Sequence, residues 1–431
     1  MPLNLIPDLT IVGAGIAGLH TGIEYLRKNP THRVVILEEY NYIGGRMVTY
    51  KKKGNQWENG AGRIHRQHKL VGQLVDKYGL TRIPFTDNIK YLDITDSRRQ
   101  LQEVNFASSP ILSQLQSLPP KVLQTNTICN LLQQTIGYSK TAQLLSRFPY
   151  YSETYYMRAD LALSNLLKDE LSTYSNYYGI AEGIQEITNK MAVEFESLGG
   201  EIRKGCKVLN VSSAASESPA RCQLIVKKTA DSTAAADSQD VTIKLFAAKV
   251  VLAVHSAALK GLFPQAPVLK HLVMTPLLRI YAVFPKGSAG AVWFKSLPKI
   301  VTNSPLRFII PISEENGTIM ISYTDADDTY DWMRFTKNGD EAQLTKSIMI
   351  EVRKLFKGMQ IPNPTFIKAH PWTWGTTYWL PGLYDPHKES VKALQVAPNI
   401  YVCGESYSMR QSWMEGALEH SNMLLDILSK R

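Results

Sequence analysis

Three glycines close to the N-terminus have the spacing of a nucleotide-binding turn. The stretch "DLTIVGAGIAGLHTGIEYLRKN" predicts a short apolar strand, then Gly13, Gly15 and Gly18, then an amphipathic helix. A second apolar stretch, "RVVILEE", ends at Glu38, twenty positions after Gly18. Strand, glycines, helix, strand and acid at this interval predict a βαβ unit that binds a dinucleotide. Its pyrophosphate would lie at the helix N-terminus, and Glu38 would accept hydrogen bonds from the adenosine ribose.

The residues after Glu38 favour a cofactor longer than a nicotinamide dinucleotide. The segment "EYNYIGGRMVTY" contains Gly45 and Arg46, and "WENGAGRIH" contains Gly60, Ala61, Gly62 and Arg63. These segments would supply further backbone N–H groups and cations at the same binding end. A Glu38 carboxylate would also repel the 2′-phosphate of NADP.

One charged residue interrupts an apolar strand pattern in the middle of the chain. In "TPLLRIYAVFP", which reads as a strand, Arg279 is the exception. A guanidinium is costly to bury without a partner. An ion pair or a solvent-exposed strand face would explain it, and so would a role in a functional site built around this strand.

Composition limits the function classes. The chain has 431 residues, 44% of them hydrophobic, and a net charge of +10, as expected for one large or two smaller cores. The basic stretch from Arg46 to Lys69 contains no recognisable nucleic-acid-binding module, so it does not favour nucleic acid over an anionic cofactor or substrate. The four cysteines are scattered and form no metal-ligand pattern, so we expect no metal and a reducing, cytoplasmic compartment. We also expect no signal peptide and no membrane span.

The motifs together resemble the flavin-containing amine oxidase superfamily, which includes monoamine oxidases, polyamine oxidases, lysine-specific demethylases and L-amino-acid oxidases. The resemblance rests on "GAGIAGL", Glu38, "GGRMVTY", "ENGA" and, near the C-terminus, "IYVCGESYSMRQSWMEGALEHS". The segments "GAGRIHRQHK" and "PLRFIIPISEENGTIMISYTD" look similar to a branch found in large DNA viruses and algae, which would place the protein in a virion or host cytoplasm. His65 and His68 in the first segment would lie either near the flavin or at the surface.

The resemblance implies an α/β fold with a discontinuous, Rossmann-like FAD-binding domain of the GR2 type. This domain would consist of residues 1–68, 178–264 and 393–431. Residues 69–177 and 265–392 would form a second, α+β domain that binds the substrate. The tyrosine-dense stretch from residue 150 to 179 predicts a packed helix pair, and a wall of the substrate channel or a homodimer contact are the alternatives.

The resemblance also implies roles in FAD binding. Glu38 would hold the ribose, Arg46 the pyrophosphate or the flavin edge, and the strand of Val208 the adenine. Gly60 to Arg63 would pass beside the isoalloxazine. Gly404 and Glu405 would lie by the ribityl chain, and the helix start from Met414 to Ala417 would point at flavin N1 and O2. A helix N-terminus there would stabilise the negative charge of reduced flavin.

At the reacting centre the sequence departs from the family pattern. Trp413 stands where monoamine oxidases have one tyrosine of an aromatic cage. In "HPWTWGTTYWLPG" Tyr378 matches, whereas Trp374 replaces the cysteine that tethers flavin and Gly375 replaces the second cage tyrosine. FAD should therefore bind non-covalently, with Trp372, Trp374 or Trp379 as the second wall of the cage.

Arg279 falls on the strand that carries a lysine near flavin N5 in the superfamily. Arginine cannot act as a base, but it can hold a water or clamp a carboxylate. The leading hypothesis is an oxidase that transfers hydride from an amine to flavin N5, with O2 as reoxidant and H2O2 as product. The alternatives are an amino-acid oxidase with Arg279 as carboxylate anchor, and a flavin-fold protein that has lost turnover and serves as a binding or structural component.

Overall fold

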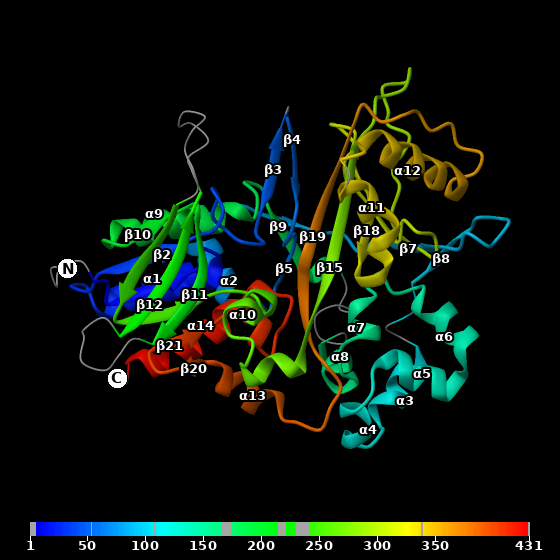
Figure 1. Cartoon of the computed structure of the whole chain (residues 1–431). Helices are drawn as coiled ribbons and strands as arrows, with labels where there is room; N and C mark the ends of the chain where they lie inside the picture. The colour runs from blue at the N-terminus through cyan, green and yellow to red at the C-terminus, as the bar shows by residue number, and fades with distance from the viewer. Residues whose placement is uncertain are drawn as a thin grey trace.

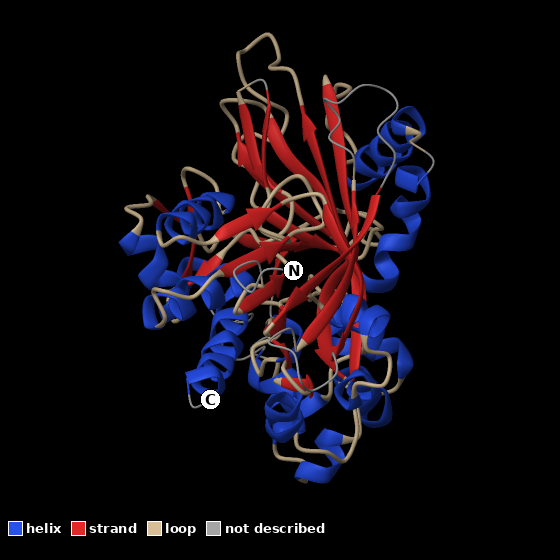
Figure 2. Ribbon diagram, turned by 60° about the vertical axis from the view of Figure 1, so that its left-hand side comes forward, coloured by secondary structure: helices blue, strands red, loops and turns tan. Residues whose placement is uncertain are grey.

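Two sheets dominate the architecture of the computed structural model (Figure 1). The structure describes residues 6–52, 54–104, 106, 109–165, 174–213, 221–229, 241–337 and 339–429. The first sheet lies near the N-terminus in Figure 1, and the long strands of the second run through the middle of the view. In Figure 2, strands of both occupy the centre of the molecule, and helices surround them.

The first sheet has six strands in the order β10-β2-β1-β14-β21-β20. Their bounds are β1 (Leu9–Val12), β2 (Val34–Leu37), β10 (Glu201–Arg203), β14 (Lys249–Leu252), β20 (Gln395–Ala397) and β21 (Ile400–Val402). All neighbours pair in parallel except β20 with β21. The central strands β1 and β2 are buried at every position, as expected for a parallel sheet covered on both faces.

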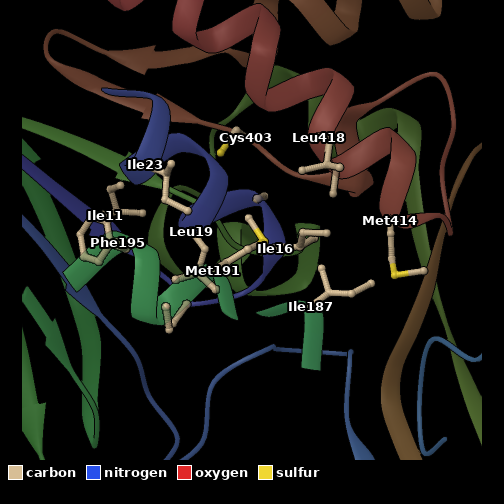
Figure 3. Close-up of a cluster of buried hydrophobic side chains, with 14 of the residues drawn as sticks. Ile11, Ile16, Leu19, Ile23, Ile187, Met191, Phe195, Cys403, Met414 and Leu418 are labelled. Atoms are coloured by element: carbon tan, nitrogen blue, oxygen red, sulfur yellow. The ribbon is translucent and has the colours of Figure 1, made fainter. Parts of the chain in front are cut away.

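Side chains of the first sheet alternate between two cores. Val34 and Ile36 of β2 pack with the helices α1 (Ile16–Lys28), α9 (Gln185–Ser197) and α14 (Met414–Ser429). Figure 3 shows this core, in which Leu19 and Ile16 of α1 lie beside Met191 of α9. Val35 and Leu37 point to the other face, which is covered by β11 (Cys206–Ser213), β12 (Cys222–Lys228) and β13 (Val241–Ala247).

The second sheet has seven strands in the order β19-β15-β18-β17-β16-β7-β8. Their bounds are β7 (Ile89–Leu92), β8 (Leu101–Glu103), β15 (Leu272–Val283), β16 (Lys299–Thr302), β17 (Phe308–Ser313), β18 (Thr318–Asp325) and β19 (Phe366–Trp379). β16 and β7 are parallel and the other pairs antiparallel, so the sheet is mixed. The predicted α/β class, with a Rossmann-like sheet and a second α+β unit, is confirmed.

Helices cover both faces of the second sheet. One face packs against α11 (Tyr330–Lys337) and α12 (Glu341–Leu355). Helices on the other side are α3 (Pro110–Gln116), α4 (Pro120–Gln124), α5 (Ile128–Ile136), α6 (Tyr138–Leu145), α7 (Ser152–Tyr155) and α8 (Ala159–Asn165). Along β15, Leu278, Ile280 and Ala282 enter the α11–α12 core, and Arg279 therefore points to the opposite face of the sheet.

Smaller elements join the two sheets. A hairpin of β3 (Thr49–Lys52) and β4 (Asn55–Glu58) lies beside a three-stranded sheet of β5 (Ile64–His65), β9 (Tyr177–Ile180) and β6 (Arg82–Pro84). The remaining helices are α2 (Lys69–Lys77), α10 (Ser256–Leu262) and α13 (Pro386–Ala393). Because β9 pairs with strands from both predicted domains, the exact division of the chain into domains stays a prediction.

The contact between α1 and the glycine turn provides a test of the fold. A Cβ at position 18 would lie 2.0 Å from the backbone oxygen of Gly13, whereas a Cβ at Gly15 meets nothing within 4 Å. We therefore expect Gly18→Ala to lower the free energy of unfolding by about 1–3 kcal/mol. Gly15→Ala, the matched control, should stay within about 0.5 kcal/mol of the parent. Urea unfolding followed by circular dichroism measures both, and equal stability of the two variants would contradict the packing.

Candidate active site

One cavity of about 1130 Å³ connects the glycine turn to Arg279. All but one of the residues singled out in the sequence as cofactor-binding or catalytic line it. They are Gly13, Gly15, Glu38, Gly45, Arg46, Gly60, Ala61, Gly62, Arg63, Val208, Arg279, Trp374, Tyr378, Gly404, Glu405, Trp413, Met414 and Ala417. The exception, Gly18, lies directly beneath the Gly13 turn. Segments that are far apart in the sequence therefore form one continuous site.

The glycine end of the cavity is a cradle of backbone. Gly13 has a φ of 106°, and a Cβ there would lie 2.6 Å from the Ala253 oxygen. Gly15 precedes α1, and no side chain caps that helix. A Cβ at Gly45 would meet only the Cα of Gly15, so two backbone turns face each other here. Uncapped N–H groups and open space at a helix N-terminus fit a pyrophosphate.

Glu38 holds the glycine turn and still faces the cavity. Its Oε2 accepts from the Ala14 N–H at 2.7 Å and its Oε1 from the Tyr40 N–H at 2.9 Å. Burial raises the pKa of the Glu38 carboxyl, and these two hydrogen bonds oppose that rise. Each carboxylate oxygen has capacity for a further hydrogen bond, which fits the hydroxyls of a ribose.

Arg46 and Glu405 connect the second glycine segment to the C-terminal loop. Arg46 Nη2 donates to Glu405 Oε1 at 2.6 Å, and its Nη1 donates to the Gly375 oxygen at 2.8 Å. The other oxygen of Glu405 accepts from the Ser412 N–H at 2.8 Å. The same carboxylate thus positions Arg46 and the loop that leads into α14, whose first residue, Met414, lines the cavity.

Arg279 is buried, with 8% of its surface exposed, so it is not on a solvated strand face. Its Nη1 donates to the Glu58 backbone oxygen at 3.0 Å, and its guanidinium carbon lies 4.7 Å from the Tyr323 ring centroid. Its Nε is buried without a hydrogen-bond partner. Within the described ranges, no carboxylate forms an ion pair with it. The explanation by a solvent-exposed strand face is therefore wrong, and no ion pair among the described residues accounts for Arg279 either.

The Arg279 guanidinium stays charged in this setting. Burial by itself lowers its pKa, but the phenol groups of Tyr323 and Tyr281 raise the pKa overall. Gly62 passes so close that a Cβ there would lie 2.9 Å from Nη1 of Arg279. The cavity thus contains a charged group whose hydrogen-bonding capacity is only partly used.

Trp413 forms one wall of the cavity. It stacks with Tyr177 at 5.8 Å and meets His68 edge-on at 4.9 Å between ring centroids. Arg63 lies over the ring of Trp413 at 5.2 Å. His65 and His68 are both buried, so their surface placement is wrong. Burial, with nearby cations, lowers the pKa of His68 to about 3, which keeps this ring neutral.

Two of the three tryptophans that are candidates for the second aromatic wall line the cavity. Trp372 and Trp374 line the cavity, with Trp374 48% exposed. Trp379 is fully buried in the core beside the first sheet and is excluded. At Gly375, a Cβ would lie 2.5 Å from the Leu277 side chain, at the irregular pairing of β15 with β19. A side chain at that position would point into β15, which explains why the residue is glycine.

Sequence reasoning missed the acids and tyrosines at the same end. Tyr150, Glu153, Tyr323 and Asp325 line the cavity. Tyr378, which was predicted, donates to Glu153 Oε1 at 3.2 Å, and burial together with Glu153 raises its pKa well above the usual value. Asp325 accepts from the Tyr151 and Ser152 N–H groups at 2.8 and 2.7 Å. The tyrosine-dense stretch was the available signal, and its alternative as a channel wall fits Tyr150.

Comparisons with known proteins identify the family. The family model described as flavin containing amine oxidoreductase matches residues 16–141 and 130–422, so the chain belongs to this family. Structurally it is similar to a putrescine oxidase double mutant with redesigned cofactor binding, with a TM-score of 0.73 and 15% identity over 99% of both chains. Wild-type putrescine oxidase bound to putrescine gives a TM-score of 0.70, 15% identity and the same coverage. At this identity the likeness establishes the fold.

Among curated relatives the chain is similar to snake L-amino-acid oxidases. The enzyme of Demansia vestigiata is 26% identical to this chain over 182 residues, and that of Cerastes cerastes is 26% identical over 183 residues. Each match covers 39% of this chain. The matched region spans 35% of the length of these relatives. Across the described ranges, no helix is both long and apolar enough to cross a membrane. The same residues contain no cluster of three or more metal-ligating side chains.

The carboxyl of Glu58, whose backbone oxygen accepts a hydrogen bond from Arg279, should make the stability of the fold depend on pH. Burial raises the pKa of its carboxyl from 4.5 to about 7. Because the folded state holds this proton more tightly than the unfolded state, the protonated carboxyl favours the fold. That contribution to stability is lost as the pH rises from about 4.5 through 7. Glutamine stays neutral at both pH values. The Tm of Glu58→Gln minus the Tm of the parent should therefore be more positive at pH 8.5 than at pH 5.5. Thermal unfolding at both pH values measures this, and a pH-independent difference would contradict the raised pKa.

Proposed function

We propose that this chain is an FAD-dependent oxidase that acts on the C–N bond of a small-molecule amine. The observation that supports this proposal most is that one continuous cavity runs from Glu38 and the glycine turn to the chamber lined by Arg279, Trp413 and Tyr378. Family membership supports the flavin, and the cradle around Gly13, Gly15 and Gly45 fits the pyrophosphate of FAD. The proposed cofactor domain is residues 1–68, 178–264 and 393–431, and the rest binds the substrate.

Each part of the cavity would hold one part of FAD. Glu38 would bind the adenosine ribose, and Arg46 and Glu405 would position the middle of the cofactor. Gly60 to Arg63 and the start of α14 would bracket the flavin ring. When bound, FAD supplies the hydride acceptor for the carbon next to the amine nitrogen and returns to its oxidised form with O2, giving H2O2.

We further propose that FAD is held without a covalent bond. Trp374 occupies the position of the tethering cysteine, and the one cysteine in the described cavity lining, Cys206, lies beside Glu38 at the other end. Acid precipitation of the purified protein should leave all flavin absorbance in the supernatant. Flavin that stays with the precipitate would contradict this assignment.

The chamber at the Arg279 end favours a neutral substrate amine. Aromatic walls from Trp413, Tyr323 and Tyr378 exclude water, which disfavours an ammonium group. The positive charge of Arg279 lowers the pKa of a nearby amine in the same direction. The chain's own residues would thus lower the pKa of the substrate ammonium, which would release its proton to water as the amine enters the chamber, so no catalytic base is needed.

An L- or D-amino acid is the second candidate substrate, and the environment of Arg279 favours it. A buried guanidinium with an unused Nε and no carboxylate partner among the described residues is suited to a substrate carboxylate. Arginine pairs with carboxylates through two parallel hydrogen bonds. The similarity to L-amino-acid oxidases supports the same candidate.

A peroxide-coupled screen under air distinguishes these substrate classes. It would offer monoamines, polyamines and amino acids to the FAD-loaded protein and record H2O2 formation. We expect turnover with at least one class. Protein that stays colourless and cannot be reconstituted with FAD would contradict the proposal.

Arg279→Met tests the role of this residue. For an amino-acid substrate, losing a charged hydrogen bond of about 1.5–3 kcal/mol should reduce kcat/KM by about 10- to 150-fold. The rate of flavin reduction should fall more than FAD affinity does. Arg66→Met, which removes an exposed arginine outside the cavity, is the control. Loss of FAD with normal reduction per bound flavin would refute the assignment.

A further inference from the structure

A second pocket lies between α2 and the small sheet of β5, β9 and β6. Its volume is about 620 Å³. One side of α2 lines it with Lys69, Gln73 and Asp76, and the strands β6 and β9 supply Arg82 and Tyr178. None of these side chains lines the cavity of the candidate active site. We call this separate space the α2 pocket.

His68 is a buried part of the lining of the α2 pocket, with 1% of its surface exposed. The His65 N–H donates to Nδ1 of His68 at 3.4 Å. Burial, with nearby cations, lowers the pKa of His68 to about 3, so the ring is neutral and its one N–H proton is on Nε2. Among the described residues this Nε2 has no hydrogen-bond partner. The pocket thus contains a buried N–H donor that needs an acceptor.

Two side chains of α2 add further donors to the α2 pocket. Lys69 and Gln73 are four positions apart, so they lie on the same side of the helix. Both are exposed, and among the described residues neither side chain has an ion-pair or hydrogen-bond partner. The one acid in the described lining, Asp76, is paired with Arg82 at 2.6 Å. Because that pair compensates the acid, Lys69 leaves the pocket with a net positive charge.

The backbone at the start of α2 takes no part in the α2 pocket, because its donors are already used. The N–H groups of Leu70 and Val71 donate to the two carboxylate oxygens of Glu415, each at 2.9 Å. A ligand would therefore be held by side chains. Pro84 and the buried ring of Tyr178 give the lining an apolar part. The volume falls in the range of about 300–1,000 Å³ that is usual for small-molecule sites.

We propose that the α2 pocket binds the phosphate group of a small phosphorylated molecule. A phosphate group has a negative charge and three acceptor oxygens, one for each of the donors on His68, Lys69 and Gln73. A carboxylate has two oxygens and would leave one of these donors unpaired. Pro84 and Tyr178 would contact the organic part of the ligand. The site is distinct from the proposed FAD and amine sites and does not depend on the proposed function.

Isothermal titration calorimetry of the FAD-loaded protein, with inorganic phosphate and phenyl phosphate as probes, tests this site. Bound FAD fills the glycine end of the main cavity, so that phosphate does not bind there. We expect both probes to bind once per chain, with phenyl phosphate the tighter because its ring contacts the apolar lining. His68→Leu and Lys69→Met each remove one donor to a charged group and should each weaken binding by about 10- to 150-fold. His68→Gln keeps an N–H donor and should bind phosphate more tightly than His68→Leu.

Lys346→Met is the matched control, because Lys346 is exposed on α12 and lines neither the α2 pocket nor the main cavity. Thermal unfolding midpoints establish which variants fold, and Lys69→Met changes an exposed side chain, so it remains decisive if His68→Leu does not fold. Absence of saturable binding of both probes would overturn the inference. Acetate that binds as tightly as phosphate would overturn the phosphate assignment. Binding lost in Arg279→Met but retained in Lys69→Met would place the anion in the main cavity and overturn the inference as well.

Discussion

The burial of the Arg279 guanidinium is the constraint around which its end of the cavity is arranged. Strand alternation in β15 sends Leu278 and Ile280 into the core and therefore turns Arg279 to the opposite face. A charge there needs compensation, which the Glu58 backbone oxygen and the Tyr323 ring provide in part. A Cβ at position 62 would lie 2.9 Å from Nη1 of Arg279, so a side chain there would displace the guanidinium. The glycine segment after β4 and the strand β15 thus depend on each other.

A few polar contacts around the same cavity connect the six-stranded sheet to the seven-stranded sheet. Arg46 bridges the Gly375 oxygen on β19 and the Glu405 carboxylate in the C-terminal loop. Glu405 in turn holds the loop before α14 through the Ser412 N–H. Because these contacts join segments from both sheets, a change in one segment would alter the position of the others. These contacts explain how segments that are far apart in the sequence form one continuous site.

Local sequence signals predicted the β1–α1–β2 unit at the glycine turn, because strand, glycines, helix, strand and acid at this interval together specify that arrangement. The α/β class and the family were predicted correctly, and nearly all of the residues singled out line one cavity. The lining of the cavity at the Arg279 end was predicted less completely. Whether Trp372, Trp374 or Trp379 faces the cavity depends on the register of β19 and its irregular pairing near Leu277. The burial of His68 and the arrival of Glu153 and Asp325 depend on packing between distant segments, which no local pattern encodes.

The central claim is that this cavity binds FAD and passes electrons to it from an amine held beside Arg279. Anaerobic titration of the FAD-loaded protein tests this most directly, using amino acids and the matching amines that lack the carboxylate. The account predicts bleaching of the oxidised flavin absorbance by at least one member of such a pair. If no amine or amino acid bleaches the flavin while dithionite does, the claim that the chain oxidises amines would be contradicted.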